Sequence, residues 1–143
     1  MKSHWWSYFR NSHEIVFDVR IYKTRFGMRK GAERHAKREF ISQKCDPNVV
    51  YSSSALCRTW SGTNFKDEMK VHIAVIFLSE QDMSYGIIAH EAFHASGFFI
   101  QKTHGKQKLL LKGKAEEDVA EVTEIIVNKI CGWMDAGYPD EYP

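Results

Sequence analysis

The sequence is poor in cysteine and in proline, with three of each among its 143 residues. The cysteines, Cys45, Cys57 and Cys131, are odd in number and form no Cys-x-x-Cys pair, which argues against a disulfide framework or a zinc ribbon. No run of about 18 apolar residues is present, so no membrane span is expected. The N-terminus also lacks the continuous apolar segment of a secretory signal. These absences favour a reducing, cytoplasmic compartment and no membrane partner.

Hydrophobic residues make up 43% of the chain and aromatic residues 13%, which is enough for an ordinary core. We therefore expect one domain over residues 1–143, with residues 1–12 and 137–143 as peripheral tails. Charge is spread unevenly, since residues 1–70 carry 14 Lys and Arg against 7 Asp and Glu, whereas residues 71–143 carry 6 against 11. The basic half could meet a nucleic acid, but a solvated helix face is the favoured interpretation.

Apolar residues recur at strand or helix spacing in six segments of the chain. Strands are predicted at residues 15–22, 49–60 and 71–78, the second of them paired with a neighbouring strand. Helices are predicted at residues 32–42, from 85 to about 100, and from about 114 to 133, and residues 25–31 are expected to form a basic turn. This arrangement predicts a small α+β domain with an antiparallel or mixed sheet.

The most informative stretch is His90-Glu91-Ala92-Phe93-His94, which has the form His-Glu-x-x-His. Residues four apart on a helix lie on the same face, so His90 and His94 can bind one metal ion. Glu91 lies about 100° round the helix, where its carboxylate can reach a metal-bound water without being a ligand. Zn²⁺ suits this set, because it binds neutral imidazoles and a catalytic zinc keeps one position open for water.

The flanking sequence favours a helix at this motif. Residues 71–78 precede it as a buried strand, and Asp82 or Ser84 can cap the helix that follows. A third ligand is best sought in the acidic start of the next predicted helix, at residues 114–121. Ile100 stands where the metzincins have their third histidine, so that class of zinc peptidase is disfavoured.

The motif, followed by Glu117, Ala120 and Glu121, resembles the thermolysin-like and aminopeptidase-like zincins, the gluzincins. Small zinc metallopeptidases of phages and bacteria look similar overall. The resemblance implies a zincin-like domain in which Glu117 is the third zinc ligand and Glu121 orients a ligating histidine. It also implies that the strand before the metal helix forms the cleft edge, where an extended peptide can add to the sheet. Glu116 competes with Glu117 as ligand, because only one of two adjacent helix residues can face the cleft.

The function implied is that of a zinc metallopeptidase acting on a peptide or protein substrate. Glu91 would be the general base toward a zinc-activated water and would then protonate the leaving amine. Two alternatives stay open, a catalytically silent zinc-binding module that serves regulation or partner binding, and a basic nucleic-acid-associated domain. Four residues are candidates for stabilising the oxyanion, and spacing does not choose among them: His72, Tyr85, His104 and Tyr138.

Overall fold

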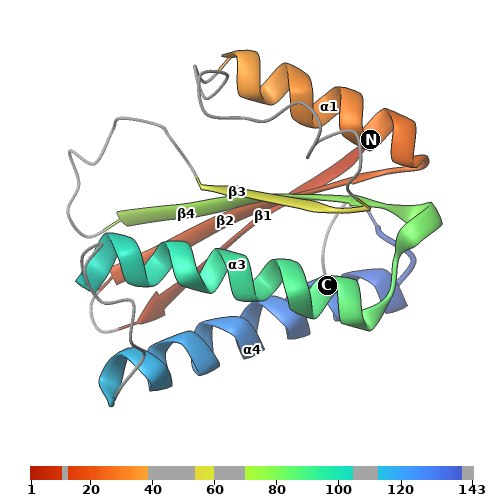
Figure 1. The fold of residues 1–143 in the computed structure, drawn as a ribbon. Helices are drawn as coiled ribbons and strands as arrows, with labels where there is room; N and C mark the ends of the chain where they lie inside the picture. The colour runs from red at the N-terminus through yellow and green to blue at the C-terminus, as the bar shows by residue number, and fades with distance from the viewer. Residues whose placement is uncertain (11–12, 39–53, 60–69, 105–112, 140–143) are drawn as a thin grey trace.

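The computed structural model describes residues 1–10, 13–38, 54–59, 70–104 and 113–139. A four-stranded sheet lies between helices on its two faces (Figure 1). The strands are β1 (Lys2–Arg10), β2 (His13–Tyr22), β3 (Leu56–Thr59) and β4 (Lys70–Ser79). The helices are α1 (Arg25–Arg38), the 3-10 helix η2 (Glu80–Asp82), α3 (Tyr85–His104) and α4 (Lys114–Asp135). This architecture confirms the predicted α+β class.

The sheet is mixed and has the strand order β1-β2-β4-β3. β2 runs antiparallel to β1 and parallel to β4, and β3 runs antiparallel to β4. β1 and β3 are therefore the edge strands, which confirms that the segment containing β3 pairs with a neighbour. The expectation that the strand at residues 71–78 forms the cleft edge is wrong, because β3 pairs along the outer side of β4.

β1 replaces the peripheral tail expected at residues 1–12. It pairs with β2 along its whole length, and Trp6 at its centre is buried. The Trp6 ring stacks on Phe17 at 5.5 Å between centroids and meets Trp133 of α4 edge-on at 5.4 Å. At the other end of the chain, Tyr138 packs against Trp133, whose indole N–H donates to the Pro139 carbonyl at 3.0 Å. Burial of this aromatic surface holds both ends of the described chain on the domain.

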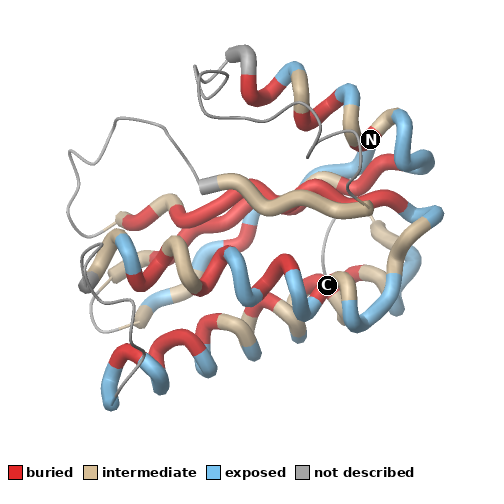
Figure 2. The backbone as a smooth tube through the Cα atoms, in the orientation of Figure 1, coloured by how far each residue is buried: buried red, intermediate tan, exposed pale blue. Residues whose placement is uncertain are grey.

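Two apolar clusters join the layers, one on each face of the sheet (Figure 2). The larger cluster lies between the sheet and the pair α3 and α4, and its helix residues include Ile88, Ala92, Ala95, Val122 and Ile126. The smaller cluster lies between the sheet and α1, and it consists of Tyr22, Met28, Ala32, Val75 and Phe77. Within the described ranges, no helix combines the length and apolar character that a membrane span requires.

α1 begins at Arg25, within the residues expected to form a turn. Thr24 caps the helix, since its Oγ1 accepts the Gly27 N–H at 3.0 Å. The two glycines of this first half, Gly27 and Gly31, have low helix propensity. Gly31 is nevertheless required for packing, because a Cβ at this position would collide with the Tyr22 ring. Close approach of α1 to the sheet therefore outweighs the propensity of its residues.

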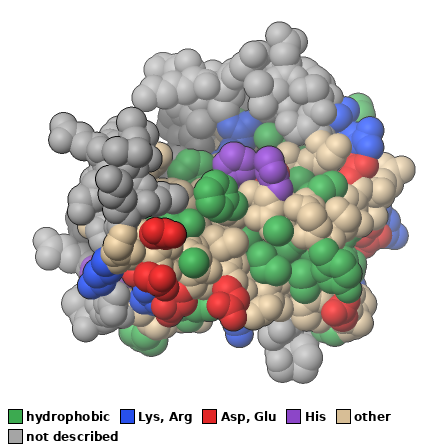
Figure 3. Space-filling view, turned by 60° about the horizontal axis from the view of Figure 1, so that its bottom comes forward, with side chains coloured by type: hydrophobic (Ala, Val, Ile, Leu, Met, Phe, Trp, Pro, Cys, Tyr) green, Lys and Arg blue, Asp and Glu red, His purple; other side chains and the backbone are tan. Residues whose placement is uncertain are grey.

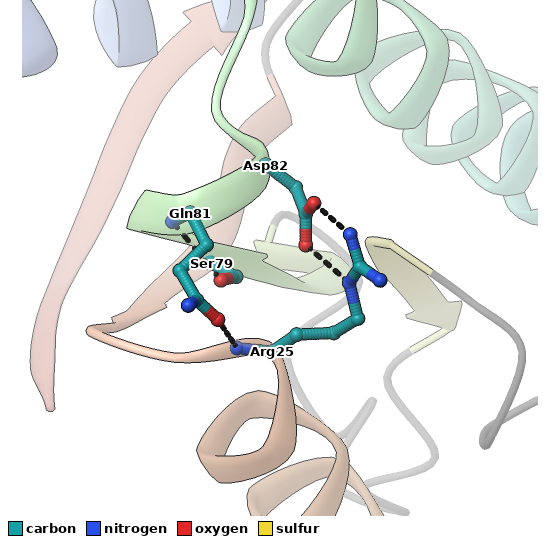
Figure 4. A network of polar contacts seen from close by, with 4 residues as sticks. All are labelled: Arg25, Ser79, Gln81 and Asp82. Atoms are coloured by element: carbon teal, nitrogen blue, oxygen red, sulfur yellow. Dashed lines mark hydrogen bonds and ion pairs between the residues drawn. The ribbon is translucent and has the colours of Figure 1, made fainter.

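Arg25 ties the start of α1 to η2 (Figure 4). Its Nε donates to Asp82 Oδ2 at 2.7 Å, a second guanidinium N–H donates to Oδ1, and its backbone N–H donates to Gln81 Oε1 at 2.9 Å. Ser79 Oγ accepts the Gln81 N–H at 3.2 Å. The hydrogen bonds from Arg25 lower the pKa of the Asp82 carboxyl. Asp82 is thus engaged by α1 and does not cap α3.

We expect Gly31→Ala to destabilise the protein by about 1–3 kcal/mol, because the added methyl group overlaps the Tyr22 ring. Gly97→Ala is the matched control, since Gly97 lies within α3 and a Cβ there meets no neighbouring atom within 4 Å. Alanine at position 97 should stabilise the helix by about 0.5–1 kcal/mol. Urea unfolding followed by circular dichroism measures both changes, and effects of the same sign would contradict the close packing of α1.

Candidate metal centre

α3 carries the His-Glu-x-x-His motif, as predicted. Ser84 caps the helix, because its Oγ accepts the Ile87 N–H at 3.1 Å. One side of α3 is buried against the sheet and α4 at helical spacing, through residues that include Ile88, Ala92, Ala95 and Phe99. Burial of this side leaves the histidines at positions 90 and 94 exposed to solvent.

His90 and His94 point toward each other. Their Nε2 atoms are 3.1 Å apart, and their ring centroids are 4.7 Å apart with the planes inclined by 73°. Two nitrogens at about 2.0–2.1 Å from one tetrahedral zinc ion would lie about 3.3 Å apart. The observed separation therefore fits a shared ion with little movement. Figure 3 shows histidine side chains adjoining at the surface, with hydrophobic side chains beside them.

The environment of His94 favours the neutral ring. Although His94 reaches solvent, partial desolvation of its ring lowers its pKa, and the neighbouring charge of His90 lowers it further. Metal ions bind the neutral imidazole, so a lowered pKa removes proton competition at the second ligand.

Glu91 lies beside the pair and is only 5% exposed. Burial raises the pKa of its carboxyl to about 7. No hydrogen bond or ion pair links it to any described residue. Glu91 and His90 both line a pocket of about 440 Å³, whose remaining walls are Ser54, Ala55, Gly86 and Ile87. A buried carboxyl with a raised pKa that faces a pocket is typical of functional sites.

Ser54 and Ala55, which come directly before β3, supply a wall of the pocket that the sequence did not point to. Ala55 lines the pocket, and Cys57, two residues further along, faces the same side of the strand. Burial raises the pKa of the Cys57 thiol well above its usual value, and the charge of Glu91 raises it further. The alternation of residues 55 and 57 places them on one face, but only the sheet order brings that face to α3.

The structure does not bring Glu117 to the two histidines. Ser96 and Thr123 meet through their hydroxyl oxygens at 2.7 Å, and the start of α3 lies beside the end of α4, so the two helices are antiparallel. Glu117 lies six residues before Thr123, which in this antiparallel pair is toward the C-terminal end of α3. His94 lies two residues before Ser96, in the opposite direction. Glu117 and His94 are therefore separated by roughly 12 Å along the helix axes. Among the described residues, no group of three His, Cys, Asp or Glu side chains could hold a metal ion.

The other acidic residues of α4 have different surroundings from those expected. Arg10 of β1 forms ion pairs with Asp118 and with Glu121, so Glu121 does not orient a ligating histidine. Asp118 is buried and has Arg10 to neutralise its charge. Glu116 and Glu117 are exposed in the first turn of α4, where the helix dipole favours negative charge.

Three of the four candidates for oxyanion stabilisation are described, and the pocket lining includes none of them. The Tyr85 hydroxyl donates to a carboxylate of α4 at 3.2 Å. Tyr138 packs against a tryptophan at the end of α4. His72 alternates with β4 residues that face α3, so its ring lies on the opposite face of the sheet. The side chain of His104 lies outside the described part of the chain.

Comparisons of the chain with protein-family models, with curated proteins and with solved structures found no match. The resemblance to gluzincins therefore rests on the motif residues alone. The function has to be argued from His90, Glu91, His94 and the pocket beside them.

We expect Glu117→Ala to bind zinc with unchanged affinity, because α4 holds this side chain away from the histidines. Glu116→Ala is its matched control and should behave in the same way. His94→Ala should lower the affinity by more than about tenfold, since it removes a ligand from the pair. Competition against a chromogenic chelator gives all three affinities. A loss confined to Glu117→Ala would show that α4 moves along α3 when zinc binds.

Glu91→Gln should stabilise the metal-free protein at high pH. Burial raises the pKa of Glu91 from 4.5 to about 7, so the folded state holds the proton of this carboxyl more tightly than the unfolded state does. The contribution of this proton to the free energy of unfolding is complete below pH 4.5. That stability is lost as the pH rises through about 7, whereas glutamine stays neutral. Thermal unfolding with a chelator, at about pH 5 and about pH 8, should therefore show a larger gain in Tm at the higher pH.

Glu124→Gln, at an exposed position of α4, is the control for that measurement. Its effect on Tm should be the same at both pH values. A pH-independent effect of Glu91→Gln as well would contradict the desolvation of Glu91.

Proposed function

We propose that the chain is a zinc-dependent peptidase on a zincin-like domain, with His90 and His94 as zinc ligands and Glu91 as general base. One observation carries this proposal. The two imidazole Nε2 atoms converge to 3.1 Å beside a pocket that the buried Glu91 also lines. A purely structural zinc site needs ligands only, so a buried carboxylate beside the pair that has no partner among the described residues favours catalysis.

Zinc fits the pair because the nitrogen separation matches two ligands of one tetrahedral ion and because burial favours the neutral form of His94. Bound zinc would act as a Lewis acid toward a carbonyl group and would activate water. The helix register does not support Glu117 as the third ligand, so the proposal names two ligands from the described residues.

Glu91 performs the proton transfers in this proposal. A carboxyl group with a pKa of about 7 both accepts and releases a proton near neutral pH, which is what a general base that later acts as a general acid requires. Because no described donor holds the carboxylate, it is available to take a proton from water and to deliver it to the leaving amine. The low polarity that raises its pKa also strengthens its interactions within the site.

The walls of the pocket indicate the kind of substrate that fits. Ser54, Ala55, Gly86 and Ile87 are small or apolar, and the volume of about 440 Å³ lies within the range of ligand pockets. We infer a peptide or protein substrate with an apolar side chain next to the scissile bond.

We infer a cytoplasmic, reducing location from the cysteines. Cys57 and Cys131 are free thiols, and both are partly buried against the larger apolar cluster. Cys45 lies outside the described residues. Disulfides form in oxidising compartments and are rare in the cytosol, so unpaired thiols fit a reducing compartment better.

The deciding experiment compares the wild type with Glu91→Gln after loading both with equal zinc. We expect the variant to keep its zinc and fold and to lose cleavage of casein or of a peptide library by roughly 10²–10⁴-fold. His90→Ala and His94→Ala should lose zinc and cleavage together, which elemental analysis and the same assay would show.

Other outcomes separate the alternatives. One zinc per chain without cleavage of a broad peptide library would indicate a silent zinc-binding module. A wild-type protein that takes up no zinc would refute the proposal. Equal cleavage by wild type and Glu91→Gln would show that Glu91 is not the base.

A further inference from the structure

α1 carries an exposed stripe on the side that faces away from the sheet. Phe26, Lys30 and Arg34 are spaced four residues apart, so their side chains follow one face of the helix. Lys23 lies two residues before the helix begins, in the bend that leads into it. All four residues are exposed, whereas the opposite side of α1 is buried against the sheet. We call Lys23, Phe26, Lys30 and Arg34 the α1 stripe.

The positive charge of the α1 stripe is not neutralised within the described part of the molecule. Lys23, Lys30 and Arg34 form no ion pair with any described residue. α1 contains six Lys and Arg in its sequence and one acidic residue, Glu33. Arg25 is the exception among the exposed cations, because Asp82 binds its guanidinium group. An unneutralised row of cations attracts polyanions.

Phe26 adds an aromatic face to this row of cations. Its side chain is 70% exposed, and Lys30 Nζ lies 5.6 Å from the centroid of its ring. An exposed phenylalanine gains nothing from burial in the folded chain, so its ring is free to contact a ligand. Cations alternating with an exposed aromatic ring are the combination that binds single-stranded nucleic acids.

We propose that the α1 stripe binds single-stranded nucleic acid. Lys23, Lys30 and Arg34 neutralise backbone phosphates, and Phe26 stacks on one base. The stripe extends about 12 Å from Phe26 to Arg34, with a rise of about 6 Å between successive residues of the stripe on the helix. A duplex buries the faces of its bases, so the aromatic ring favours a single strand. The cations alone would also suit an acidic protein, but the exposed ring would then have no role.

This surface is separate from the metal centre. α1 covers one face of the sheet, whereas α3 and the pocket lie on the other (Figure 1). The proposal therefore goes beyond the peptidase function and does not depend on it. Variants of the α1 stripe should leave zinc content and peptide cleavage unchanged.

The test is fluorescence anisotropy with a labelled single-stranded DNA, an RNA of the same sequence and the duplex DNA, at salt concentrations from about 50 mM to about 200 mM. We expect the wild type to bind a single strand more tightly than the duplex and to lose affinity as salt rises. Arg34→Glu should weaken binding and reduce the salt slope by about 0.7, the value for one contact to a single strand. Phe26→Ala should weaken binding roughly 5- to 150-fold and leave the slope unchanged.

Lys114→Glu is the matched control, because it makes the same charge change at an exposed position of α4 on the far side of the sheet. It should bind as the wild type does, and circular dichroism should show that all variants are folded. Binding of either the DNA or the RNA strand supports the proposal, and the tighter of the two identifies the ligand. Absence of binding at the lowest salt, equal loss for Lys114→Glu, preference for the duplex or an inert Phe26→Ala would each overturn it.

Discussion

The antiparallel contact between α3 and α4 decides which side chains can share a site with His90 and His94. Ser96 Oγ donates to the Ala92 carbonyl within α3 at 2.8 Å and lies 2.7 Å from the Thr123 hydroxyl of α4, so the two helices share a hydrogen bond between their side chains. A slip of α4 by one turn would break the bond to Thr123, although Ser96 would keep its bond to Ala92. The acidic first turn of α4 is therefore held near the far end of α3, away from the histidines.

That register also explains how the acidic residues of α4 are used. Asp118 and Glu121 face β1, where Arg10 compensates their charge and allows Asp118 to be buried. Removing Arg10 would leave a buried carboxylate without a counter-charge, which is costly. The same guanidinium group fixes the end of β1 against α4. An acidic cluster that resembles a ligand helix in sequence thus contributes to the packing of the edge strand.

Strongly periodic elements were predictable from the sequence. β2, β4, α3 and α4 each have a long apolar pattern with one period, and the convergence of His90 and His94 follows from their four-residue spacing. The third ligand was not predictable in this way. The spacing of Glu117, Ala120 and Glu121 shows that these residues share a face of α4. It does not show which residues of α3 lie beside them, because the register between two helices is set by their packing in the folded molecule.

β1 and the first half of α1 were not predicted from the sequence. β1 was expected to be a peripheral tail, although Trp6 and Tyr8 alternate with exposed neighbours as in an ordinary strand. α1 was expected to start seven residues later, and the part that was missed contains two poor helix formers, Gly27 and Gly31. In both cases the deciding contact lies far away in the chain or across layers, with Trp133 for β1 and Tyr22 for α1.

The parallel pairing of β2 with β4 has a consequence for the order of folding. β1 and β2 are adjacent in sequence and can form a hairpin early, as can the helix pair α3 and α4. β2 and β4 are separated by residues 23–69, so their pairing must overcome the entropy of closing a long loop. Because β3 needs β4 as its template, the residues directly before β3 that line the pocket, Ser54 and Ala55, can take their places only after this slow step. We therefore expect the site to be among the last regions of the molecule to form during folding.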